Sequence, residues 1–173
     1  MRKIFLACSL LCAIACQQPA PKTEVVEVQT TVTTATDSTR GTAYFAGPDV
    51  DLLQKLVTTV EKADWDGAKS CFSDTARVFV NVTSIDTASM SVMDALNHEK
   101  ADRVNWENVS YGTPILEVVT TPAGEKYGHL WATFSATNKK SGKKVEVPIF
   151  ASYLIKEGKL QWESLIYDTG KFQ

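Results

Sequence analysis

Residues 143–168 read KKVEVPIFASYLIKEGKLQWESLIYD, and this stretch predicts the fold of the chain. It contains two runs rich in β-branched and aromatic residues, 143–155 and 160–168. Residues 156–159 (KEGK) separate the runs and include the glycine of a tight turn. We therefore expect a hairpin of two long antiparallel strands here.

The first of these strands is expected to be apolar on both faces. Its odd positions are apolar from Val145 to Ile155, and Pro148, Phe150 and Leu154 are apolar at even positions. A strand with two apolar faces is covered on both sides. Helices of the same chain can cover only one face, so we expect a partner subunit or a bound ligand on the other. We predict a homodimer through the open face of the sheet.

Two further strands precede the hairpin and extend it into a meander. We expect them at 113–121 and 126–137, joined by a turn at 122–125 (PAGE). A polar turn at 138–142 (NKKSG) then leads to the hairpin. A shorter strand is expected at 77–82, where β-branched and aromatic residues recur.

Helices are expected at the start of the domain. Asp49 can cap a helix whose apolar residues recur at three- and four-residue spacing, and further helical turns are expected near 68–72. A third helix is expected at 90–104, with an inner face of Met93, Leu96 and Val104. This order of elements predicts an α+β domain, in which N-terminal helices pack on one face of a curved antiparallel sheet.

The first 15 residues are typical of a secretory signal, with a positive start and an apolar stretch too short to span a bilayer. Small residues before Cys16 resemble the bacterial lipobox, so Cys16 is the expected site of lipidation. Residues 16–46 are expected to form a flexible, threonine- and proline-rich tether to a domain at 47–173. We expect a lipoprotein of the bacterial cell envelope. Gln17 replaces the aspartate that retains many lipoproteins in the inner membrane, which favours the outer membrane.

Composition excludes several classes of protein. The formal net charge of −2 provides no electrostatic drive for nucleic-acid binding. The sequence has only two histidines, and Cys71 is the one cysteine after Cys16, so no set of residues has the spacing of a metal site. No glycine-rich phosphate loop occurs, and we expect no cofactor.

Two stretches of the chain resemble a known fold family. Residues 63–76 (ADWDGAKSCFSDTA) look like the family's helices leading into its first strand, and 142–150 (GKKVEVPIF) with 158–160 (GKL) look like its final hairpin. The family is the nuclear-transport-factor-2-like (NTF2-like) fold, and within it the chain resembles SnoaL-like proteins and steroid Δ-isomerases over about residues 49–170. The resemblance implies a cone with a cavity between sheet and helices, but no particular reaction.

The isomerase resemblance can be compared position by position. The aspartate base, the oxyanion tyrosine and the protonated aspartate of that enzyme class would match Val80, Leu56 and Phe150. Apolar side chains neither take a proton nor donate a hydrogen bond to an oxyanion. The resemblance therefore implies that isomerisation by that mechanism is lost, which favours binding over catalysis.

Two residues are candidates for acid–base chemistry. His129 alternates with Trp131 along its strand; it is the best available base if that face lines the cavity, and part of the dimer interface if it does not. Glu163 faces inward if the hairpin resemblance holds, where burial would raise its pKa, or toward solvent on an edge strand. The candidate cavity walls are Trp65, Phe79, Phe150, Leu154 and Tyr167.

Three functions remain open at this point. The sequence favours a membrane-anchored module that binds a small apolar or amphipathic ligand. The first alternative is a cyclase-, hydrolase- or isomerase-type enzyme that uses His129 or Glu163. The second is a protein-interaction module that uses the open face of the sheet.

Overall fold

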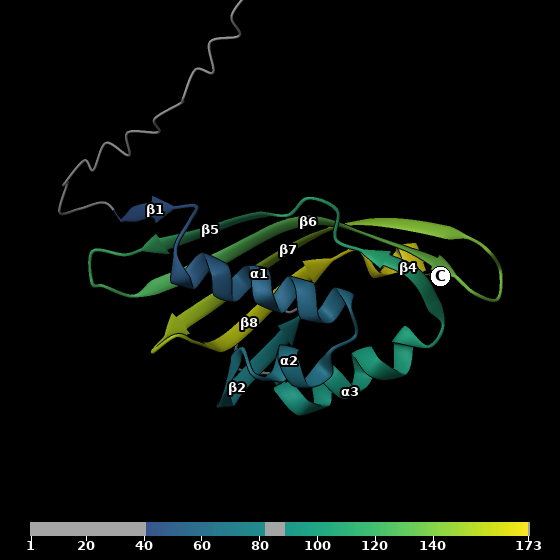
Figure 1. Ribbon diagram of the computed structural model, residues 1–173, viewed down its shortest axis with the longest axis horizontal. Coiled ribbons are helices and arrows are strands. Elements are labelled where there is room, and N and C mark those ends of the chain that lie inside the picture. The colour runs from purple at the N-terminus through teal and green to yellow at the C-terminus, as the bar shows by residue number, and fades with distance from the viewer. Residues whose placement is uncertain (1–40, 82–88, 173) are drawn as a thin grey trace, which may run out of the picture. The chain divides into compact units, whose positions relative to one another are not determined.

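Helices cover one face of a curved, open sheet in the part of the chain that the structure describes (Figure 1). The structure is a computed structural model and describes residues 41–81 and 89–172. The helices are α1 (Pro48–Glu61), α2 (Trp65–Lys69) and α3 (Val92–Arg103). The predicted α+β class, with N-terminal helices packed on a curved antiparallel sheet, is confirmed.

The sheet has the strand order β1-β5-β6-β7-β8-β2-β3, and β4 pairs with β6. The described pairs are antiparallel except for β2 and β8, which run parallel. A short 3-10 helix, η1 (Thr169–Phe172), follows the last strand. The strands are β1 (Thr42–Tyr44), β2 (Phe72–Val80), β3 (Ser89–Ser91), β4 (Trp106–Ser110), β5 (Ile115–Thr120), β6 (Lys126–Asn138), β7 (Lys144–Lys156) and β8 (Lys159–Tyr167).

The predicted meander is present as β5 to β8, with ends that differ from the expected ones by no more than two residues. Strand β2 begins at Phe72, so the helical turns expected near 68–72 end at Lys69. The strands β1, β3 and β4 were not predicted, because each is short and has little apolar alternation. Strand β1 lies within the stretch expected to be tether, and it pairs with β5.

The helix caps differ from expectation. The N-cap of α1 is Gly47, and Asp49 lies in the first turn, where its Oδ2 accepts a hydrogen bond of 2.6 Å from Lys126 Nζ. Helix α3 begins later than predicted because Ser91 caps it, with its Oγ accepting from the Asp94 amide at 3.1 Å. Met93 and Val104 are exposed, contrary to the prediction, because Val92, Ala95 and Leu96 form the face of α3 that packs against the core.

The strand register divides the sheet into two faces. We call the face that packs on the helices the inner face. It carries a row of four residues, each opposite the next on the neighbouring strand: Leu116, Leu130, Ala151 and Leu165. The outer face carries the alternate residues of the same strands. Cys71 is fully buried in the core on the helix side, as expected of a structural cysteine.

The signal at 1–15, Cys16 and the tether up to residue 40 lie outside the described residues. Within 41–81 and 89–172, no helix is both long enough and apolar enough to cross a bilayer.

Candidate functional site

A cavity of about 260 Å³ lies between the inner face of the sheet and the helices α1 and α3. Its walls are mainly aliphatic, and β2, β6, β7 and β8 form its floor. Glu163 of β8 and Tyr153 of β7 are polar residues on that floor, opposite each other in the strand register. The aliphatic and thioether side chains of the wall include Leu56, Val57, Val60, Val78, Val80, Met90, Val92, Leu96, Leu130, Ile149 and Leu165.

Glu163 is the central polar group of this cavity. Its Oε1 accepts a hydrogen bond of 2.9 Å from the Tyr153 hydroxyl, and its second oxygen has no partner among the described residues. Burial raises the pKa of Glu163 to about 7, because an apolar surrounding disfavours the carboxylate. The Tyr153 hydrogen bond opposes that rise, and the negative charge of Glu99 adds to it. Near neutral pH this carboxyl can therefore either donate or accept a proton.

Two further tyrosines line the same cavity. Tyr111 precedes β5, and its amide donates a hydrogen bond of 3.1 Å to Glu61 Oε1 at the end of α1. Tyr167 ends β8, two residues beyond Leu165 on the inner face. Burial raises the pKa of both phenols, so they stay protonated at neutral pH. Neither hydroxyl has a hydrogen-bond partner within the described part of the chain, so both are available to a ligand.

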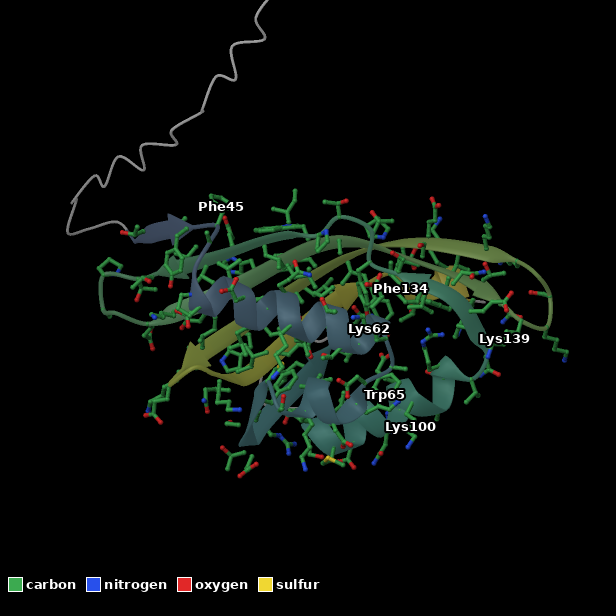
Figure 2. The ribbon with its side chains drawn as sticks, viewed as in Figure 1. Phe45, Lys62, Trp65, Lys100, Phe134 and Lys139 are labelled. Carbon is green, nitrogen blue, oxygen red and sulfur yellow. The ribbon has the colours of Figure 1, made fainter. Side chains whose placement is uncertain are left out.

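The cavity continues into a second compartment of about 460 Å³, toward the C-terminus. Tyr111, Tyr167, Ile149 and Leu165 line both compartments. The second compartment is largely aromatic: Trp65 of α2 and Phe134 of β6 lie on its walls (Figure 2). Phe172 of η1 packs there against three other rings, those of Trp106, Phe134 and Tyr167, with centroids 5.8 Å apart.

Charged residues stand at the rim of both compartments. Glu99 and Asp102 of α3 line each of them and are exposed, and His98 lines the first. Arg103 lines only the second compartment, where its Nη1 donates a hydrogen bond of 2.8 Å to the Trp106 carbonyl. Its buried Nε has no partner in the described structure.

The predicted wall residues fall on both sides of the sheet. Tyr167 lines both compartments, and Trp65 lines the second. Phe150 and Leu154 do not line either cavity, because they alternate with the inward residues of β7 and lie on the outer face. Phe79 is buried, but it pairs with Ser164 on the same outer side of the sheet.

The two acid–base candidates are separated by the sheet. Glu163 faces inward into the cavity, whereas His129 lies on the outer face. There His129 Nδ1 lies 3.1 Å from Glu117 Oε1, and its ring packs against Trp131 and Phe150 at 5.6 and 5.9 Å. His129 is therefore not a base for a ligand in this cavity.

Of the three positions matched to the isomerase residues, Phe150 does not lie in the cavity. Leu56 and Val80 line the cavity, as the resemblance implies, but Phe150 points to the other face. The neighbouring Ile149 is the inward residue at that level of β7. A shift of one residue along a strand exchanges the two faces, which a count along the sequence alone does not detect.

Sequence reasoning found Tyr167 but missed Tyr111 and Tyr153, the other two tyrosines that line the cavity with Glu163. The signal for Tyr153 was present, since it shares odd-numbered parity with Val147 and Ile149, both buried on β7. Tyr111 lies in an irregular segment between β4 and β5 and has no periodic pattern that would have indicated its position. Among the described residues no group of three or more metal-ligating side chains is present.

Comparison by sequence finds no match, either among family models or among curated proteins. Comparison by structure finds matches of the same fold. An NTF2-like protein from Burkholderia xenovorans superposes with a TM-score of 0.54 at 13% identity, over 74% of this chain and 95% of that one. PrhC from Penicillium brasilianum superposes with a TM-score of 0.58 at 12% identity, over 73% and 83%.

A third match is a hypothetical protein from Catenulispora acidiphila with a ketosteroid isomerase-like fold, solved in complex with trimethylamine. It superposes with a TM-score of 0.54 at 10% identity, over 70% of this chain and 88% of that one. At these identities the likeness shows the fold, which is NTF2-like, and assigns no activity.

Proposed function

We propose that this chain, whose described part has the NTF2-like fold, binds a small apolar or amphipathic molecule in the cavity around Glu163. The observation that supports this proposal is an apolar cavity with the carboxyl of Glu163 on its floor. Ligand sites are typically concave, mainly apolar, and carry a few polar groups that orient the ligand. Glu163, Tyr111 and Tyr167 are such groups here, each with an oxygen that has no partner in the described structure.

Native mass spectrometry of the full-length protein purified from cells tests this proposal. We expect a reproducible extra mass that is lost on denaturation. Ala95→Phe would fill the cavity from α3 and should remove the extra mass. Val104→Phe, at an exposed position next to the end of the same helix, is the matched control and should retain it. Equal extra mass in both variants would contradict binding in this cavity.

Catalysis by Glu163 is the second candidate function. It is favoured by the pKa of about 7, because a general acid–base works best when its pKa lies near the working pH. Turnover of a substrate found by screening should fall by about 10²-fold or more in Glu163→Gln. His129→Ala should leave it unchanged, since His129 lies on the other face. Activity that survives Glu163→Gln would exclude this mechanism.

Two further proposals concern where the domain works. We propose that a lipid on Cys16 anchors the chain in the bacterial cell envelope, in the outer membrane, with the residues before the domain acting as a tether.

We also propose that a second copy covers the outer face, where Ile115, Trp131 and Ile166 are 59%, 40% and 51% exposed. If another protein covers this face instead, the chain is an interaction module.

A further inference from the structure

The first compartment of the cavity has carboxyl groups but, among the described residues, no permanent positive charge. Glu163 lies on its floor, and Glu99 and Asp102 lie at its rim. No lysine or arginine of the described chain lines it, and the other ionisable side chains there are His98 and three tyrosines. Arg103 reaches the second compartment only, and its Nη1 is already engaged with the Trp106 carbonyl. A charged group that enters the first compartment is therefore favoured if it is positive.

The tyrosines favour the same kind of ligand. Tyr111, Tyr153 and Tyr167 contribute aromatic rings to the walls around Glu163. Ring faces attract cations, and the attraction is stronger where water is excluded. Burial raises the pKa of all three phenols and keeps them neutral, so they add no competing anion. The second oxygen of Glu163 has no partner in the described structure, so it can form an ion pair with the positive group of the ligand.

From this arrangement we propose that the ligand is a small hydrophobic cation, an amine or a quaternary ammonium compound. Its nitrogen lies beside Glu163 and the tyrosine rings, and its hydrocarbon part contacts the aliphatic walls. This inference deepens the proposed function and rests on it. The compartment of about 260 Å³ that contains Glu163 is slightly smaller than typical ligand sites, about 300–1,000 Å³, so the part of the ligand that enters it is small.

A neutral ligand with a carbonyl group is the competing possibility, and pH separates the two. A carbonyl oxygen needs protonated Glu163 as a hydrogen-bond donor, whereas a cation needs the carboxylate. The affinity for a permanent cation should therefore rise with pH through the pKa of about 7, and the affinity for a carbonyl ligand should fall. The ionisable groups that line the compartment with Glu163 are Tyr153 on β7, Tyr167 on β8, Tyr111 before β5, and His98, Glu99 and Asp102 on α3. Glu61 at the end of α1 lies next to Tyr111.

The test uses benzyltrimethylammonium and its neutral carbon isostere, neopentylbenzene. Both are titrated into the full-length protein at about pH 6 and pH 8.5, and binding is followed by the amide NMR shifts of cavity residues. If only the carboxylate form binds the cation, the affinity rises about tenfold between these pH values. Glu163→Gln should abolish this rise and weaken the cation alone. His98→Gln, which removes the imidazole at the rim of the compartment, should keep it.

Each outcome has a distinct meaning. A cation bound at least about tenfold more tightly than the isostere at the higher pH, with the pH rise lost in Glu163→Gln, supports the inference. Equal binding of both probes at both pH values overturns the inference and leaves the proposed small-molecule site intact. A pH rise lost in His98→Gln instead of Glu163→Gln also overturns it. No shift of cavity amides with either probe counts against the inference and the proposed site together.

Discussion

At the scale of single residues, Glu163 is an ionisable group in an apolar environment that disfavours its charged form. Its carboxyl sits among aliphatic side chains, where the ionised form lacks most of the solvation it has in water. The Tyr153 hydroxyl compensates part of that loss through a hydrogen bond of 2.9 Å. A polar group that destabilises the fold and faces a cavity is typical of a functional residue.

Glu163 should make the stability of the protein fall with rising pH. Its pKa in the folded state, about 7, lies above its ordinary value of 4.5, so the folded chain holds this proton more tightly than the unfolded chain does. The contribution is complete below about pH 4.5 and is lost as the pH rises through about 7. The shift corresponds to about 3 kcal/mol of unfolding free energy.

Urea denaturation of Glu163→Gln at about pH 4.5 and pH 8.5 measures this effect. The variant should lose about 3 kcal/mol less than the wild type between the two pH values, because the amide that replaces the carboxyl does not ionise. Glu107→Gln, at an exposed position on β4, is the control and should follow the wild type. Parallel losses in all three proteins would mean that Glu163 is solvated in the folded state.

At the scale of elements, the packing of α1 on the sheet depends on a close contact between Leu53 and Gly128. Leu53 of α1 is almost fully buried against β6, and Gly128 provides the space for it. A Cβ at position 128 would lie 2.8 Å from Leu53 Cδ1 and 3.2 Å from Ile155 Cδ1. Contacts this short in a packed core force side chains or helices to move.

Gly128→Ala should therefore lower the unfolding free energy by about 1–3 kcal/mol. In a Leu53→Ala background the same change should cost about 0.5 kcal/mol or less, since the clashing side chain is absent. Thr133→Ala, exposed on the same strand, is a control for strand propensity. A cost that is the same in both backgrounds would exclude the Leu53 contact as its cause.

The proposed dimer contact through the outer face of the sheet is tested by a charge placed on that face. Ile166→Glu should convert a dimer to a monomer in sedimentation at micromolar concentration, because a buried unpaired carboxylate is costly at an apolar interface. Val104→Glu, at a position that is 65% exposed and next to the end of α3, should leave the mass unchanged. A wild type that is strictly monomeric under these conditions would contradict the proposed homodimer.

At the scale of the whole molecule, we propose that a lipid anchor at the N-terminus holds a ligand-binding domain at the membrane. Cys16→Ser should move the protein from the membrane fraction to the soluble fraction and abolish incorporation of labelled fatty acid. Cys71→Ser is the matched control, because Cys71 is buried in the core and should not change the fractionation. A membrane-bound Cys16→Ser protein, in cells where the wild type takes up no fatty acid, would contradict the lipoprotein proposal.

The segments of the sequence with regular apolar alternation correctly predicted the long strands of the sheet. Long runs of apolar and β-branched residues indicated β5 to β8, since a strand of this length leaves a signal at many positions. Strand β1, with three residues, and strand β4, with five, form through pairing with distant strands and leave little local signal. Met93 was misplaced because tertiary packing selects Val92, Ala95 and Leu96 as the inner face of α3, and the few apolar residues of this helix do not specify that face.

What the sequence by itself determined is the class of the domain and the apolar character of its cavity. Composition and alternation are local properties, and they were enough to predict helices followed by a curved sheet. Only the tertiary structure decided which face of each strand meets the helices. That choice depends on register between strands distant in the chain, and it places Glu163 inside, with His129 and Phe150 outside. The same register brings Tyr153 to Glu163, ten positions away in the sequence, and so creates the enclosed carboxyl on which the proposed function depends.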